Sequence, residues 1–189
     1  MKKNENVSSI LFLLEEVSAC EMLKKMMPRL FPTLSCKYRT FSGKPDLLLR
    51  LEKTIRNHTD EDCHFVIVCD QDADDCVKLK QKISESCQKT GRKARCHIRI
   101  ACRELESWYL AQLDVVSRHF GVPEVVNLQD KKYRYPDHID KPSEELKRIT
   151  KGNYQKVKGS RKMGEYLNLS VDRSTSFRNF VEVLKKLAG

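Results

Sequence analysis

The sequence predicts an α/β fold in which a central parallel sheet of about four strands is flanked by helices. Short apolar segments alternate with amphipathic segments over the first 115 residues, in the order βαβαβαβα. This alternation is typical of parallel sheets, whose strands are joined by right-handed helical crossovers. Residues 116–189 predict a mainly helical, basic extension that packs on the 1–115 core as part of one compact unit.

Two strands and two helices are predicted in the first third of the chain. Residues 8–14 form an apolar run, and residues 36–41 alternate as a second strand. Between them, residues 18–30 predict a helix with Ser18 as its N-cap in a capping box, kinked or shortened by Pro28. A turn at 41–46 then leads to a helical stripe of leucine and isoleucine over 47–55.

The second half of the core repeats this pattern. Residues 64–70 are apolar on both faces, as expected of a buried parallel strand, and residues 94–102 predict the fourth strand. Helices are predicted over 76–87 and 104–112, with Trp108 more consistent with a core position than with base stacking. Beyond residue 121 we expect a short helix near 143–150, an irregular basic loop at 151–162 and an amphipathic helix over 177–187.

Composition narrows the cellular context. No apolar run approaches the roughly 20 residues that span a bilayer, and no cleavable leader is recognised, so we expect a cytoplasmic protein with no membrane partner. The eight cysteines show no zinc-binding spacing, and we expect free thiols in a reducing compartment. The formal net charge of +10 suggests a polyanionic partner, although a solvated lysine-rich surface gives the same balance.

Carboxylates follow three of the four predicted strands, and they are the main functional signal. They are Glu15 and Glu16 after the first strand, Asp70 and Asp72 after the third, and Glu104 and Glu106 after the fourth. Ligands of open parallel sheets bind at this edge, and converging carboxylates favour a hard divalent cation. Capping of the following helix by Asp72 or Asp74 is the alternative, and Asp74 and Asp75 are expected to stabilise that helix through its dipole.

A metal held at the rim of a parallel sheet suits phosphoryl chemistry, in which it activates a water and stabilises the leaving oxygen. Competing machinery is absent: the chain contains no Walker loop, dinucleotide-binding glycine motif or nucleophile elbow. Basic residues supply candidate phosphate and nucleic-acid contacts, namely Lys44 in a turn and Lys156, Lys158, Arg161 and Lys162 around Gly159. Lys44 could instead pair with a carboxylate, and the others could form a solvated charge run.

Taken together, these motifs resemble a known group of proteins. A glutamate after the first strand and Asp-x-Asp after a later one resemble the TOPRIM signature of topoisomerases, DnaG-type primases and OLD-type nucleases. The chain is most similar to a family of small stand-alone TOPRIM-like proteins of unknown function, often encoded beside ABC- or AAA-type ATPases, including in phage defence. The supporting segments are FLLEEVS at 12–18, GKPDLL at 43–48, VCDQDADDC at 68–76, RIACRELESW at 99–108, YPD at 135–137, YQKVKG at 154–159 and RSTSF at 173–177.

The resemblance implies a Mg²⁺ (or Mn²⁺) site formed by Glu15, Asp70 and Asp72, with Glu104 and Glu106 as further catalytic acids of the same pocket. Two positions depart from the family pattern: Val17 replaces a usual proline, and Gln71 replaces an arginine that could position phosphate. Neither change removes a carboxylate.

The resulting prediction is a Mg²⁺-dependent TOPRIM-type nuclease, or another phosphodiester-acting enzyme, that works with an ATPase partner in defence or in DNA or RNA processing. The alternative is a catalytically silent subunit that binds an ATPase partner and nucleic acid. A third interpretation is an RNA-processing ribonuclease. The sequence leaves open whether DNA or RNA is the substrate and whether the chain forms a homodimer.

Overall fold

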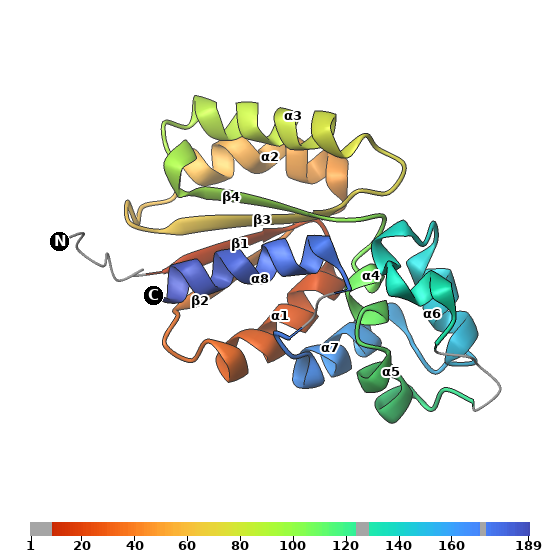
Figure 1. Cartoon of the computed structure of the whole chain (residues 1–189). Helices are drawn as coiled ribbons and strands as arrows, with labels where there is room; N and C mark the ends of the chain where they lie inside the picture. The colour runs from red at the N-terminus through yellow and green to blue at the C-terminus, as the bar shows by residue number, and fades with distance from the viewer. Residues whose placement is uncertain (1–8, 124–128, 171–172) are drawn as a thin grey trace.

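The computed structural model describes residues 9–123, 129–170 and 173–189, and its centre is a four-stranded parallel sheet (Figure 1). The strands are β1 (Ile10–Leu14), β2 (Cys36–Thr40), β3 (His64–Asp70) and β4 (Cys96–Ala101), in the order β2-β1-β3-β4. Ile10 is in register with Cys36 on one side and with His64 on the other. The predicted α/β fold with four parallel strands is therefore confirmed.

Helices cover both faces of the sheet (Figure 1). On one face lie α2 (Lys44–Arg56) and α3 (Cys76–Lys89), and on the other lie α1 (Val17–Leu30) and α8 (Thr175–Ala188). Every residue of β1 is buried, and its alternate side chains enter two separate hydrophobic clusters, one against each layer of helices. This two-sided burial explains why the strands are apolar on both faces.

The remaining helices form a group beside the carboxyl end of the sheet (Figure 1). They are α4 (Glu106–Leu110), α5 (Leu113–Phe120), α6 (Pro142–Ile149) and α7 (Lys156–Tyr166), with 3₁₀ turns η2 (Lys131–Arg134) and η3 (Pro136–His138). A further 3₁₀ turn, η1 (Lys93–Arg95), lies at the opposite end of the sheet, directly before β4. Trp108 is fully buried and stacks on Phe180 of α8 at 4.9 Å between ring centroids, so it is a core residue. One hydrophobic cluster thus includes residues from both sides of position 115, and the division there stays a prediction.

The basic segment differs from the sequence prediction. Residues 156–166 form α7, whereas we expected an irregular loop over 151–162. This helix packs closely on α1: a Cβ atom on Gly164 would lie 2.2 Å from the carbonyl oxygen of Met22. Tertiary packing of this kind stabilises helices whose sequence shows only weak periodicity, which explains why the pattern alone did not reveal α7.

The start of α1 and the segment after β4 also differ from expectation. Glu16, not Ser18, is the N-cap residue of α1, and Ser18 donates its hydroxyl hydrogen bond to the Glu16 carboxylate, so the predicted capping box is wrong. The helix expected over 104–112 is shorter, because α4 spans only Glu106–Leu110, and a separate helix, α5, begins at Leu113.

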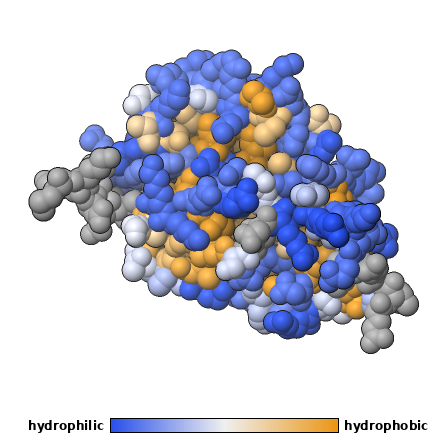
Figure 2. All heavy atoms as spheres, in the orientation of Figure 1, coloured by the Kyte–Doolittle hydropathy of each residue, from blue (hydrophilic) through white to orange (hydrophobic). Residues whose placement is uncertain are grey.

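Hydrophilic residues cover most of the face shown in Figure 2, with hydrophobic side chains visible between the elements. None of the helices in the described ranges is long and apolar enough to cross a membrane. All eight cysteines are free thiols, as predicted from their spacing.

Candidate metal centre

The candidate site lies at the topological switch point of the sheet, between β1 and β3. From β1 the chain moves to β2 on one side, and β3 then adds on the other side. Crevices at such switch points, outside the carboxyl ends of the strands, are the usual ligand sites of open parallel sheets. Glu15 directly follows β1, and Asp70 is the last residue of β3, so both lie at this point.

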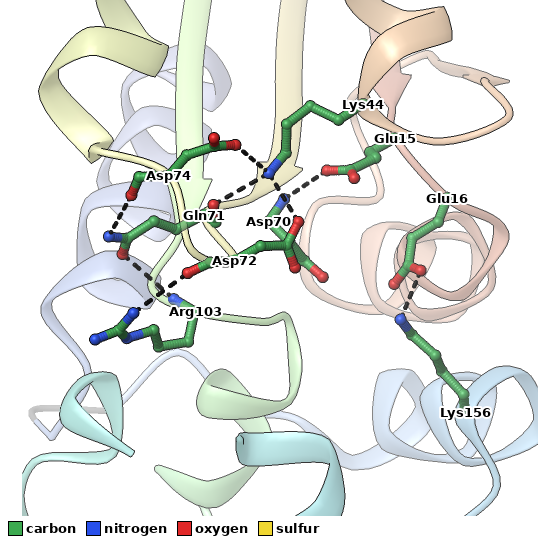
Figure 3. Close-up of polar contacts among 9 residues, drawn as sticks. All are labelled: Glu15, Glu16, Lys44, Asp70, Gln71, Asp72, Asp74, Arg103 and Lys156. Atoms are coloured by element: carbon green, nitrogen blue, oxygen red, sulfur yellow. Dashed lines mark hydrogen bonds and ion pairs between the residues drawn. The ribbon is translucent and has the colours of Figure 1, made fainter. Parts of the chain in front are cut away.

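The Glu15 carboxylate is hydrogen-bonded to the neighbouring strand, β3. Its Oε2 accepts a hydrogen bond of 2.8 Å from the backbone N–H of Asp70 (Figure 3). Burial raises the pKa of Glu15, while the Asp70 N–H and Lys44 oppose this shift. The structure therefore brings together the first two acids of the predicted set.

Asp70 is the most unusual group of the site. It is only 7% exposed, and no described residue donates a hydrogen bond to its carboxylate. Burial raises its pKa well above the ordinary value, and the nearby carboxylates of Glu16, Glu106 and Glu15 raise it further. A buried carboxylate without donors and among other acids is unfavourable unless a cation compensates it.

Glu106, the first residue of α4, is a second buried acid. It is 0% exposed, and its Oε1 accepts a hydrogen bond of 2.8 Å from the Tyr154 hydroxyl. Its Oε2 is buried and has no partner among the described residues. Burial raises the pKa of Glu106, and Lys156 and Tyr154 limit the increase.

Lys156 provides the positive charge nearest to these acids. Its Nζ lies 2.7 Å from Oε2 of Glu16, an ion pair that joins α7 to the start of α1 (Figure 3). Burial lowers the pKa of Lys156, but Glu16, Glu106 and Asp70 together raise it above its ordinary value. One lysine thus faces several carboxyl groups of the cluster.

Asp72, unlike Asp70, is paired with a lysine. Lys44 Nζ lies 2.7 Å from Asp72 Oδ2 and 2.7 Å from Asp74 Oδ2, and it donates to the Gln71 carbonyl at 3.1 Å. The backbone of Asp72 is left-handed, with φ 54°, so Asp70 and Asp72 are not same-side positions of one extended strand. Of the two roles considered for Lys44, pairing with carboxylates is the one the structure shows.

Two other acids accept hydrogen bonds from the N-terminal turns of helices. Glu104 Oε2 accepts a hydrogen bond of 2.7 Å from the Ser143 N–H in the first turn of α6. Asp75 caps α3 by accepting from the N–H groups of Val77 and Lys78 at 2.9 and 3.1 Å. Capping therefore explains Asp75 and Glu104, whereas Asp72 and Asp74 do not cap α3.

Of the four predicted basic contacts on α7, Lys156 is the one that enters the acidic cluster. Arg161 pairs with Glu21 of α1 at 2.5 Å, and Lys162 donates to the His119 carbonyl at 2.6 Å. Lys158 is exposed to solvent. Arg161 and Lys162 thus contribute to helix packing, and their role in nucleic-acid binding stays a prediction.

The donor set fits a hard divalent cation. Asp70, Glu15, Glu16 and Glu106 offer carboxylate oxygens, which Mg²⁺ and Mn²⁺ prefer. Sequence reasoning noted Glu16 at a strand end but did not include it among the metal ligands. Its position beside Glu15 in the same loop was the available signal.

A second group of potential metal ligands lies close together elsewhere in the described part of the chain. Within the described ranges, the three potential ligands whose atoms lie within 4.8 Å of one another are His58, Asp60 and Cys63, before β3 at the opposite edge of the sheet. The Arg92 guanidinium donates to the backbone carbonyls of both His58 and Asp60. A guanidinium already lies beside this cluster, whereas the Asp70 carboxylate accepts no hydrogen bond from the described residues, so we place the candidate cation site at Asp70.

The fold and the acidic edge of the sheet define an open parallel α/β protein with carboxylates gathered at the carboxyl ends of its strands. The chain belongs to the family described as Domain of unknown function (DUF4276), whose model matches residues 14–185. A solved structure, the C-terminal region of the Burkholderia pseudomallei OLD protein, is 12% identical with a TM-score of 0.54, covering 95% of this chain and 98% of that one. No curated protein is detectably similar. Membership of a family of unknown function is thereby confirmed, while the TOPRIM relationship and the ATPase association stay predictions.

Proposed function

We propose that this chain is a Mg²⁺- or Mn²⁺-dependent nuclease, or another phosphodiester-acting enzyme, of the TOPRIM type. The observation that carries the proposal is Asp70, a buried carboxylate with no donor among the described residues, at the switch point of the sheet and beside three other acids. The similarity in fold to the C-terminal region of an OLD protein supports the same assignment.

The residues of the site divide into complementary roles. Asp70 and Glu15 would hold the metal, with Glu16 beside them and with Asp72 able to join once Lys44 releases it. When bound, the metal would supply an activated water and stabilise the leaving oxygen. Glu106 would accept a proton from water at Oε2, which has no described partner and whose raised pKa suits a general base. Lys156 would orient Glu16 through their ion pair, and Glu104 would position α6.

The test is cleavage of DNA and RNA by the purified chain with Mg²⁺ or Mn²⁺, compared with Asp70→Asn. We expect cleavage that requires the metal and is lost in the variant. Asp114→Asn is the matched control, because it removes an exposed carboxylate on α5 and should leave the rate unchanged. Cleavage that survives Asp70→Asn would refute the assignment.

A second candidate, a catalytically silent subunit that binds an ATPase partner and nucleic acid, rests on the pairing of Lys44 with Asp72. Because the second acid of the Asp-x-Asp motif is already neutralised, the metal set could be incomplete. If so, the wild-type chain would cleave neither nucleic acid in Mn²⁺, and Lys44→Met, which frees Asp72, would gain cleavage. Retention of an ABC- or AAA-type ATPase by the tagged chain, identified by mass spectrometry, would then support the silent role.

A further inference from the structure

A pocket of about 590 Å³ adjoins the acidic edge of the sheet. Gln71 and Arg103, from the loops that follow β3 and β4, form one side of it, and Tyr135, His138 and Arg173 line the rest. Gln71 lies between Asp70 and Asp72 in the chain, and Arg103 lies beside Asp72 (Figure 3). The pocket and the candidate metal centre therefore share the loop after β3.

Two segments distant in sequence are locked together in the wall of this pocket. The Asp137 carboxylate accepts hydrogen bonds from the Ser174 hydroxyl at 2.6 Å, the Ser176 N–H at 2.9 Å and the Ser176 hydroxyl at 3.1 Å. The Ser176 hydroxyl also accepts from the buried Trp108 indole N–H at 2.8 Å. These hydrogen bonds give the YPD and RSTSF segments a structural role. They also connect the pocket lining to the buried core at Trp108.

The lining combines an aromatic surface with positive charge. Tyr135 is 64% exposed and stacks on His138, with ring centroids 5.8 Å apart and planes inclined by 27°. Arg103 pairs with Asp140 at 3.2 Å, but that carboxylate is 84% exposed, so the pair is weak and exchangeable. The one acid in the lining, Asp137, is already occupied by its three hydrogen bonds.

We propose that this pocket binds an unpaired nucleotide of single-stranded nucleic acid, next to the phosphodiester that the Asp70 site acts on. Tyr135 and His138 offer a stacking surface for the base, while Arg103 and Arg173 contact the flanking phosphates. Aromatic stacking with neighbouring cations is how proteins bind single strands without reading their sequence. The proposal rests on the proposed function, because it adds a substrate subsite to the same centre.

The test is fluorescence anisotropy of labelled single-stranded DNA, single-stranded RNA and duplex DNA, with the full chain and Ca²⁺ in place of Mg²⁺. We expect Tyr135→Ala to weaken single-strand binding by about tenfold or more, and Tyr135→Phe to retain it. Tyr166→Ala is the matched control, since that tyrosine is 43% exposed and stacks on His119 of α5. A difference in affinity between single-stranded DNA and single-stranded RNA would identify the preferred sugar. It supports the pocket provided that Tyr135→Ala abolishes the tighter binding.

Equal single-strand affinity of Tyr135→Ala and Tyr166→Ala would overturn the pocket, as would duplex binding as tight as single-strand binding. Cleavage assays separate this failure from failure of the proposed function. If cleavage requires Asp70 while Tyr135→Ala binds normally, the nuclease assignment stands and the pocket does not. If no metal supports cleavage but Tyr135→Ala loses single-strand binding, the pocket stands without the catalytic assignment.

Discussion

Asp72 and Arg103, which lie in the loops that follow β3 and β4, both have a left-handed backbone and are hydrogen-bonded to each other. Their φ angles are 54° and 60°, and the Asp72 N–H donates to the Arg103 carbonyl at 2.7 Å. Left-handed conformations are rare outside glycine and cluster at functional sites. Here they turn two loops toward each other at the edge that carries the acids and the pocket.

Two replacements of Asp72 should separate the effect of backbone strain on stability from the effect of the lost charge. We expect Asp72→Ala to lower the free energy of unfolding by about 1 kcal/mol more than Asp72→Asn, because asparagine tolerates the left-handed region and alanine does not. Asp74 is the matched control: it pairs with the same lysine at the same 2.7 Å distance and has no positive φ. Urea unfolding would measure this, and an equal Ala–Asn difference at both positions would contradict the strain argument.

The sheet could be predicted from sequence because its strands are buried on both faces. Between Phe65 and Cys69, β3 is apolar whichever way its side chains point, so local pattern and tertiary environment agree. The basic segment over 151–162 could not be predicted in this way, although the C-terminal helix expected over 177–187 is present as α8. The 151–162 segment lies largely in α7. This helix depends on close approach to α1 at Gly164, a contact between distant segments that periodicity does not encode.

The candidate site was only partly predictable for a related reason. Strand ends place Glu15 and Asp70 together, because parallel strands terminate at one edge. The left-handed turn at Asp72 and the capping of α6 by Glu104 redirect two other acids, and both depend on loops whose geometry follows from tertiary contacts. The pairing of Lys156 with Glu16 likewise requires α7 to be in place.

Gly164→Ala should be strongly destabilising, because the added methyl group would overlap the Met22 carbonyl, which is backbone and cannot rotate away. We expect a loss of about 2–3 kcal/mol in the free energy of unfolding and a matching fall in melting temperature. Val157→Ala on the same helix is the control, because Val157 is 43% exposed and its replacement should change stability by less than about 0.5 kcal/mol. Similar melting temperatures for the two variants would argue against close α1–α7 packing.

The ion pair between Lys156 and Glu16 should show measurable coupling. In a double-mutant cycle of Lys156→Met and Glu16→Gln we expect about 1 kcal/mol, limited by solvent screening because the lysine side chain is 42% exposed. Lys156→Met alone should be the more damaging change, since Asp70 and Glu106 also lose their nearest cation.

The control cycle uses Lys25→Met and Glu165→Gln. That pair also joins α1 to α7, but its atoms are 3.4 Å apart and both side chains are 40% exposed or more, so we expect coupling close to zero. Equal coupling in both cycles would mean that Lys156 has no special electrostatic role in the acidic cluster.

Asp70→Asn should stabilise the metal-free protein, with a defined dependence on pH. Because its pKa is raised in the folded state, Asp70 binds its proton more tightly folded than unfolded. Its contribution to stability therefore falls as the pH rises from the unfolded value of about 3.9 through the folded pKa, and the full penalty is present above it. We expect the variant to be more stable than wild type by about 1–3 kcal/mol at neutral pH, with the advantage shrinking as the pH falls.

Metal should reverse this order, because a cation that binds only the folded wild-type protein stabilises it by mass action. Urea titrations across the pH range, with and without Mg²⁺, should show stabilisation of the wild type that grows with pH and is absent in Asp70→Asn. Asp114→Asn should behave like the wild type in both series, since its carboxylate is exposed. If Mg²⁺ stabilised Asp70→Asn as much as the wild type, the metal would bind elsewhere, and the buried carboxylate at the switch point would need another explanation.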